Sequence, residues 1–150
     1  MFKHILVPVD GSDSAQRAVE HAASLARTYG ARLVLLQVMV RIGSDQVPAS
    51  LREVARTEHI EVTEARLLRS VAESIVEKAK DLAKAGGAED VETAIEHGDP
   101  ANTIVDYGTA HDIDLIVMGR RGLGQLAGLL MGSVSHKVAH HSTCACLTVP

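Results

Sequence analysis

Short apolar runs alternate along this chain with longer segments in which hydrophobic residues recur every three or four positions. Runs of the first kind predict strands buried on both sides, and segments of the second kind predict amphipathic helices. The predicted strands are residues 4–10, 33–38, 91–97, 115–118 and 145–149. The predicted helices are residues 15–26, 67–82, 100–110 and 133–141.

Glycine and capping residues mark the ends of these elements. Gly30 stands where a C-terminal cap of the first helix is expected, and Gly86–Gly87 end the second. Asp99–Pro100 supply an N-cap and a first-turn proline for the third. Residues 41–58 show no clear period and predict a loop, with a short helical turn around residues 51–54 left open as an alternative.

Strands that alternate with helices predict an α/β fold, in which helices cover both faces of a parallel sheet. A chain of 150 residues has the usual length of one domain. We therefore expect a single domain over residues 1–150, built on an open, doubly covered sheet of five parallel strands.

Composition narrows the classes of function. The formal net charge is −4, and the chain has two Tyr, one Phe and no Trp, which argues against a nucleic-acid-binding protein. No apolar run approaches the roughly 20 residues of a membrane helix. The N-terminus leads directly into a strand pattern without a signal peptide. These features predict a cytoplasmic protein that binds neither nucleic acid nor membrane.

The connection after the fourth predicted strand carries the most informative motif. Gly119, Gly122, Gly132 and Ser133 are spaced G-x2-G-x9-G-S, and Ser133 stands where it would cap the last helix. Glycine lets the backbone approach an anion closely, and the free N–H groups of a first helical turn favour negative charge. The motif, hereafter the glycine motif, therefore predicts a phosphate-binding site. The chain has neither the lysine-containing P-loop nor a G-x-G-x-x-G fingerprint.

With this motif the chain resembles the universal stress proteins, over its whole length. The resemblance includes residues 5–12, residues 98–100 and the apolar run 115–119 that leads into the glycine motif. It implies the ATP-binding branch of that family, the strand order 3-2-1-4-5, and a homodimer through residues 145–149. The site would then lie where strands 1 and 4 are neighbours, at the switch point of the sheet.

The resemblance also implies which residues form the nucleotide site. Adenine and ribose would meet residues at the ends of the first, second and fourth strands, and the phosphates would meet the glycine motif and the start of the last helix. The implied set is Pro8, Val9, Asp10, Val38, Met118, Gly119, Arg120, Gly122, Gly132, Ser133, Val134 and Ser135. Asp10 has a second interpretation as a helix cap alongside Ser12. The pair Arg120–Arg121 either reaches the phosphates or lies on a solvated loop.

The expected cofactor is ATP, with AMP or ADP as alternatives, accompanied by Mg²⁺ or Mn²⁺. We expect a regulatory, stress-linked module with an adenine nucleotide as ligand and an unidentified protein partner. A slow ATP hydrolase or phosphotransferase, and an AMP-bound or nucleotide-free interaction protein, remain alternatives. No Asp or Glu follows Asp114, and no residue is predicted to be catalytic; His136 is the nearest candidate for a base.

Cysteine and histidine residues near the C-terminus raise the question of a metal site. Cys144 and Cys146 are separated by one residue, and His136 and His140 are spaced i, i+4. The expected interpretation is two small, buried, apolar cysteines and two exposed histidines, since a tetrahedral site needs ligands that converge. No metal site formed by protein ligands is predicted.

Overall fold

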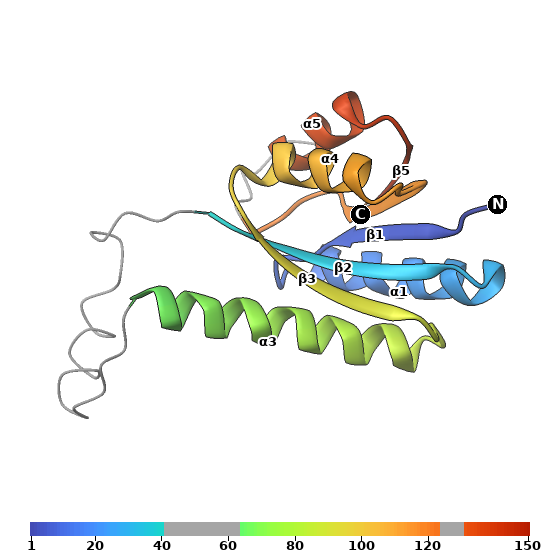
Figure 1. The fold of residues 1–150 in the computed structure, drawn as a ribbon, viewed down its shortest axis with the longest axis horizontal. Coiled ribbons are helices and arrows are strands. Elements are labelled where there is room, and N and C mark those ends of the chain that lie inside the picture. The colour runs from blue at the N-terminus through green and yellow to red at the C-terminus, as the bar shows by residue number, and fades with distance from the viewer. Residues whose placement is uncertain (41–63, 124–130) are drawn as a thin grey trace.

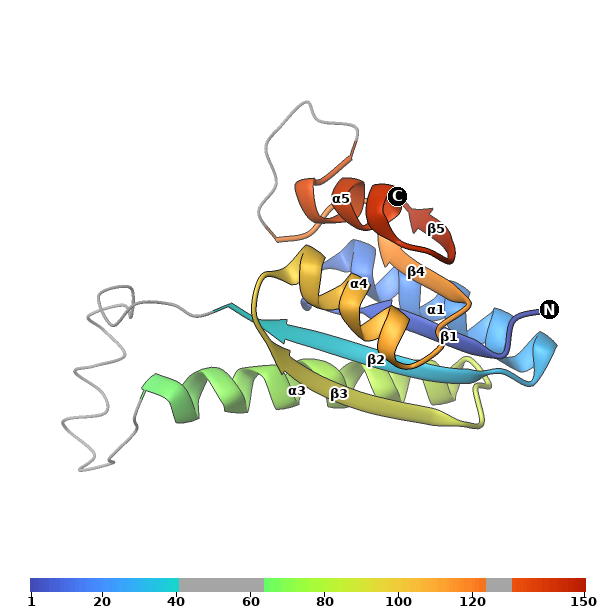
Figure 2. The ribbon, with the colours of Figure 1, turned by 45° about the horizontal axis from the view of Figure 1, so that its top comes forward.

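In a computed structural model of the chain, five parallel strands form one sheet in the order β3-β2-β1-β4-β5 (Figures 1 and 2). The structure describes residues 1–40, 64–123 and 131–150. The strands are β1 (His4–Pro8), β2 (Arg32–Met39), β3 (Val91–His97), β4 (Leu115–Gly119) and β5 (Ala145–Val149). The helices are α1 (Asp13–Tyr29), α3 (Glu64–Ala85), α4 (Pro100–Ala110) and α5 (Ser133–His141). The expected fold and strand order are confirmed.

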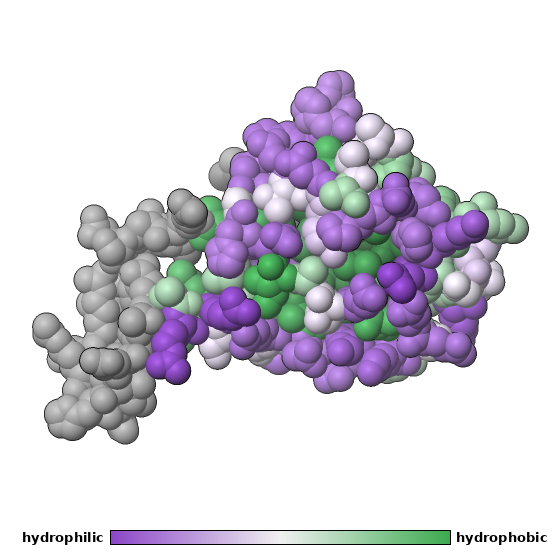
Figure 3. Space-filling view, in the orientation of Figure 1, coloured by the Kyte–Doolittle hydropathy of each residue, from purple (hydrophilic) through white to green (hydrophobic). Residues whose placement is uncertain are grey.

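The helices form two layers, one on each face of the sheet. Figure 1 shows α1 and α3 below the strands and α4 and α5 above them. Each layer encloses its own hydrophobic cluster, centred on Val7, Val19 and Leu35 on the α1–α3 side and on Leu6, Leu36 and Ile116 on the α4–α5 side. In Figure 3, hydrophobic residues form patches in the middle of the visible face, between α4 and α3, among hydrophilic residues that dominate the rest of that face. Among the described residues, no helix is long and apolar enough to cross a membrane.

The first strand is shorter than predicted. β1 ends at Pro8 instead of Asp10, because the Asp10 carboxylate accepts the Ser12 N–H at 2.9 Å and turns the chain into α1. Gly30 ends α1 as predicted, in the left-handed conformation with φ of 62°. The predicted loop at residues 41–58, with its possible turn at residues 51–54, lies outside the described residues.

The two edges of the sheet are β3 and β5. β3 places the carboxylates of Glu92 and Glu96 on its surface. β5 carries no charged residue, and its Leu147 side chain is 40% exposed. Charged residues on an edge strand discourage pairing with another chain, so β5 is the edge that is open to it.

Candidate functional site

A cavity of about 330 Å³ opens at the carboxyl ends of β1, β2 and β4 and at the start of α5. β1 and β4 pair in the middle of the sheet, where the winding reverses; ligands of open α/β sheets bind at this position. The cavity is lined by Pro8, Val9, Asp10, Ser12, Ala15, Leu36, Gln37, Val38, Val40, Pro100, Ile104, Met118, Gly119, Arg121, Gly122, Leu123, Gly132, Ser133, Val134 and Ser135.

All the predicted site residues except Arg120 line this cavity. The sequence analysis missed a second group, which comes mainly from segments that fold against the motif from far away in the chain. That group is Ala15, Leu36, Gln37, Val40, Pro100, Ile104 and Leu123. The proline that begins α4 was the available signal, because it marks a helix start at the same edge of the sheet.

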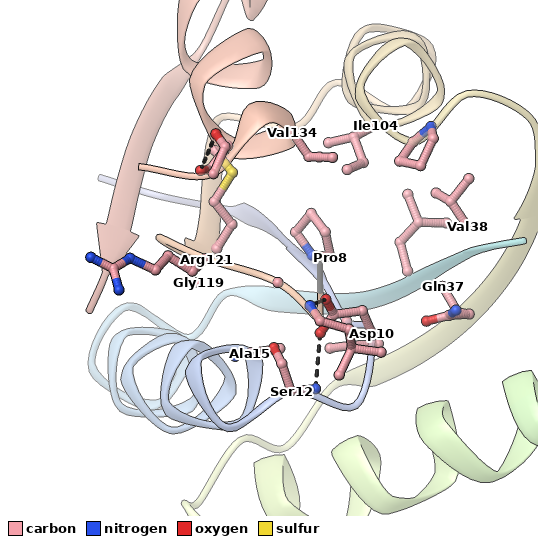
Figure 4. A pocket seen from close by; sticks show the side chains of 18 of the residues that line it. Pro8, Asp10, Ser12, Ala15, Gln37, Val38, Ile104, Gly119, Arg121 and Val134 are labelled. Carbon is pink, nitrogen blue, oxygen red and sulfur yellow. Dashed lines mark hydrogen bonds between the residues drawn. The ribbon is translucent and has the colours of Figure 1, made fainter. Parts of the chain in front are cut away.

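One wall of the cavity is apolar. Figure 4 shows Pro8, Val38, Ile104 and Val134 around the same space, contributed by two strands and two helices. Met118, which is 3% exposed, belongs to the hydrophobic cluster under α4 and α5. Such a wall suits a flat ring system that is buried on binding.

The end of β2 adds backbone groups to this wall. Pro8, the last residue of β1, pairs with Leu36, and the Val9 N–H donates to the Leu36 C=O at 2.9 Å. β2 continues to Met39 with β3 as its partner. Because hydrogen-bonding directions alternate along a strand, the N–H and C=O of Val38 face the β1 side after the β1 ladder has ended. The strand thus presents one donor and one acceptor beside the apolar wall.

Asp10 connects the first turn to the glycine motif. Its Oδ1 accepts the Ser12 N–H, as a dashed line in Figure 4 marks, and its Oδ2 accepts the Leu123 N–H at 3.2 Å. The cap of α1 is Ser12, whose Oγ accepts the Ala15 N–H at 3.2 Å. A Cβ on Gly122 would lie 2.5 Å from Asp10 Oδ2. Asp10 therefore supports the turn, and at the same time lies against the motif inside the cavity.

The start of α5 differs from the expectation. The N-cap is Gly132, and no side chain of residues 1–40, 64–123 or 131–150 caps the helix, so the prediction that Ser133 is the cap is wrong. The cause is the Gly132 N–H, which donates to the Arg120 C=O at 2.8 Å and fixes Gly132 in an extended conformation just before the helix. The helical ladder begins with His136 N–H on the Gly132 C=O at 3.0 Å. The N–H groups of Ser133 and Val134 come before that bond, at the cavity.

The two arginines contribute mainly through their backbones. The Arg120 N–H donates to the Val149 C=O at 2.6 Å, and its C=O accepts from Gly132 N–H and from Ser135 Oγ. Arg121 lines the cavity, but Figure 4 shows its guanidinium directed away from the cavity. In this arrangement neither side chain lies in the space where the motif would hold phosphates.

Ser135 is 4% exposed, and its hydroxyl is already engaged. It donates to the Arg120 C=O at 2.8 Å and lies 3.1 Å from the Gly132 C=O. The predicted role of Ser135 as a second phosphate-binding hydroxyl stays a prediction.

The C-terminal cysteines fit a packing role. Both are free and half-buried, and both pack on the α4–α5 cluster. Burial, and next the neighbouring Cys146, raise the pKa of the Cys144 thiol. A raised pKa makes the reactive thiolate scarcer. Within residues 1–40, 64–123 and 131–150, no group of three or more His, Cys, Asp or Glu side chains lies together as metal ligands.

Comparison with known proteins supports one family throughout. The model of the universal stress protein family matches residues 1–150. The chain is 35% identical to the universal stress protein YxiE of Bacillus subtilis, with 99% of each chain covered. It is 33% identical to a putative universal stress protein of Staphylococcus aureus, covering 99% of this chain and 84% of that one.

Solved structures lead to the same family. A universal stress protein in complex with cAMP is 30% identical, with a TM-score of 0.71 and coverage of 99% and 97% of the two chains. The universal stress protein UspA of Lactobacillus plantarum is 29% identical, with a TM-score of 0.72 and coverage of 99% and 98%. An Arabidopsis thaliana member with AMP bound shares the fold at 22% identity, with a TM-score of 0.68 and coverage of 98% and 90%. From the match over its full length and from these relatives, the chain belongs to the universal stress protein family.

Proposed function

We propose that this protein binds ATP and acts as a nucleotide-dependent regulatory module of a stress response. The observation that carries the proposal is the start of α5, which opens on the cavity and has no side-chain cap among the residues that the structure describes. The first N–H groups of a helix need acceptors, and the helix dipole favours an anion there. A phosphate group supplies both the acceptor oxygens and the negative charge.

The rest of the cavity accommodates the remainder of the nucleotide. The adenine ring would lie against Pro8 and Met118, with its polar edge on the N–H and C=O of Val38. The ribose would lie near Asp10, and the phosphates would extend past Gly122 to the start of α5. The relatives whose structures hold cAMP and AMP support an adenine nucleotide as the ligand class.

Mg²⁺ or Mn²⁺ would accompany the triphosphate. These ions take oxygen ligands, largely from phosphates and water when a nucleotide carries them. The cavity offers the Ser133 hydroxyl, while both oxygens of Asp10 already accept backbone N–H groups. This donor set fits an ion that arrives with the phosphates better than an ion held by the protein alone.

A regulatory role is preferred to catalysis. Phosphoryl transfer needs a positioned nucleophile and groups that neutralise the developing charge. The guanidinium of Arg121 is directed away from the cavity (Figure 4), and no Asp or Glu follows Asp114 in the chain. A slow hydrolase or phosphotransferase is the second candidate, and a protein that holds AMP or no nucleotide is the third. A cytoplasmic location stays a prediction.

A homodimer through β5 is part of the same proposal. The support is the uncharged edge strand with exposed Leu147, in contrast to the acidic β3 edge. Light scattering of the protein at micromolar concentration should give the mass of two chains, and Leu147→Lys should reduce it to one. A monomeric wild-type protein would remove the dimer from the proposal without affecting the nucleotide site. An unidentified protein partner remains expected.

The deciding experiment has two stages. Mass spectrometry of the nucleotide released from freshly purified protein identifies what the cavity holds. Calorimetric titration of the emptied protein with ATP, AMP and GTP, with and without Mg²⁺, then ranks the ligands. ATP should bind most tightly. Preference for AMP would favour the third candidate, and absence of binding by any of the three nucleotides would overturn the proposal.

A further inference from the structure

Two buried serine hydroxyls hold consecutive carbonyl groups at the start of the β4–α5 connection. Ser14, in the first turn of α1, donates to the Arg121 C=O. Ser135, in the first turn of α5, donates to the Arg120 C=O at 2.8 Å. Ser14 is 6% exposed and Ser135 is 4% exposed, and with Ser12 they are the buried polar residues of the described chain. The two hydroxyls therefore donate hydrogen bonds to neighbouring residues of the same backbone segment, from two different helices.

Gly119 makes this arrangement possible. A Cβ at Gly119 would lie 2.8 Å from the carbonyl carbon of Ser14 and 3.0 Å from the Ala15 nitrogen. Only a residue without a side chain lets the end of β4 come this close to the first turn of α1. That approach brings the Ser14 hydroxyl within reach of the Arg121 carbonyl. The first glycine of the motif therefore allows the end of β4 to pack closely against α1, in addition to any role near a ligand.

The orientation of the carbonyl groups fixes the orientation of the following N–H groups. In a trans peptide, the C=O of one residue and the N–H of the next point in opposite directions. With the Arg121 C=O held toward Ser14, the Gly122 N–H points away from the Ser14 hydroxyl, and Gly122 itself lines the cavity. This N–H makes no hydrogen bond to another residue of the described ranges.

We propose that Ser14 and Ser135 are positioning residues of the nucleotide site, which hold residues 120–122 so that the Gly122 N–H faces the phosphates. The inference rests on the proposed ATP binding. In this role both serines act through the backbone: Ser14 does not line the cavity, and the Ser135 hydroxyl is engaged by the C=O groups of Arg120 and Gly132. A donor that is oriented before the ligand arrives needs no ordering when it binds, so the pair raises affinity by preorganisation.

The test compares ligands that differ only in phosphates. Ser14→Ala and Ser135→Ala would be titrated calorimetrically with adenosine, AMP and ATP. Ser142→Ala is the matched control, because its half-buried hydroxyl contacts Cys144 and Cys146, away from the cavity. Each positioning variant should lose about fivefold or more in ATP affinity, while adenosine affinity stays within about twofold and the control is unchanged. Equal losses for adenosine and ATP would overturn the inference, since they would indicate a general defect of the fold.

A second measurement does not depend on any ligand. Amide hydrogen exchange of nucleotide-free protein should be faster over residues 119–123 in both variants, and unchanged there in Ser142→Ala. Unchanged exchange in both positioning variants would overturn the inference even if ATP binds. If the wild-type protein binds no nucleotide, the proposed function fails, and the exchange result alone decides whether the serines position the connection. Because the hydroxyls belong to different helices, loss of folding in one variant leaves the other as the test.

Discussion

Helices α1 and α4 begin at the same edge of the sheet as α5, but they satisfy their first N–H groups in a different way. α1 is capped by the Ser12 hydroxyl, and α4 by the Asp99 carboxylate, which accepts the Asn102 N–H at 3.0 Å. α5 begins at Gly132, and no side chain in the described part of the chain caps it. Two of the helix starts therefore have an acceptor in the residue that precedes them, and the third has none among the described side chains.

This difference separates residues that stabilise the fold from residues that serve a ligand. A capped start contributes about 1 kcal/mol to the free energy of unfolding. An uncapped start beside a cavity gives up that contribution and keeps its N–H groups available. Local rules of helix capping are broken where function is expected, and they are obeyed around it.

The largest effect is expected for Gly122→Val, which changes the segment that precedes the uncapped start of α5. Its Cβ would lie 2.5 Å from Asp10 Oδ2, so either the Asp10 carboxylate or the backbone at residue 122 must shift, and both line the cavity. We expect at least a tenfold loss of ATP affinity by calorimetry, about 1.4 kcal/mol. Gly108→Ala on α4 is the control, since its Cβ would meet nothing closer than 3.7 Å. Unchanged binding by a folded Gly122→Val protein would refute the site.

Asp10→Ala affects both the turn into α1 and the glycine motif, because the carboxylate accepts the N–H groups of Ser12 and of Leu123. We expect a loss of ATP affinity of about fivefold to tenfold, and a smaller effect on the free energy of unfolding in urea. If thermal stability collapses while affinity is retained, Asp10 is only a turn residue.

Asp99→Ala tests a capped helix start. The Asn102 N–H loses its acceptor, which should lower the free energy of unfolding by about 1 kcal/mol and the Tm by about 3 °C. ATP affinity should stay within about twofold, because Asp99 does not line the cavity. A large loss of ATP affinity in Asp99→Ala would contradict the distinction between capped helix starts, which stabilise the fold, and the uncapped start at the ligand site.

The last prediction concerns the rate at which bound ATP is hydrolysed, which we expect to be very low. An uncapped helix start supplies donors for binding, but it does not position a water molecule for attack. Release of phosphate, followed with purified protein and Mg²⁺-ATP, should stay far below about 1 per second. Steady turnover near that rate, abolished in Ser133→Ala, would favour the hydrolase alternative.

Much of this architecture follows from local patterns in the sequence. Residues 91–97, 133–141 and 145–149 were assigned with the observed bounds, since each is a clear periodic or apolar run between glycine and capping signals. Asp99 was identified as a cap for the same reason. The errors arise where a long-range contact overrides a local rule. The hydrogen bond from Gly132 to Arg120 decides which residue caps α5.

The prediction of the candidate site was correct to a similar degree, and its gaps have a similar cause. The motif and the strand ends led to the cavity, because both lie on segments with recognisable patterns. The partners of Ser14 and Ser135 lie 107 and 15 residues away along the chain. A hydroxyl in a first helical turn has several possible local partners, so its actual acceptor is known only once the helices have packed.

The two backbone groups of Arg120 have a thermodynamic consequence. The N–H is held by Val149, the last residue of the edge strand β5, and the C=O by the start of α5. Arg120 therefore links the chain that follows β4 both to the edge strand β5 and to the start of α5. If association at that edge changes the nucleotide affinity by some factor, the nucleotide must change association by the same factor. If the nucleotide and a second chain bind as proposed, Arg120 joins the cavity to the edge strand, and the two binding events report the same coupling free energy.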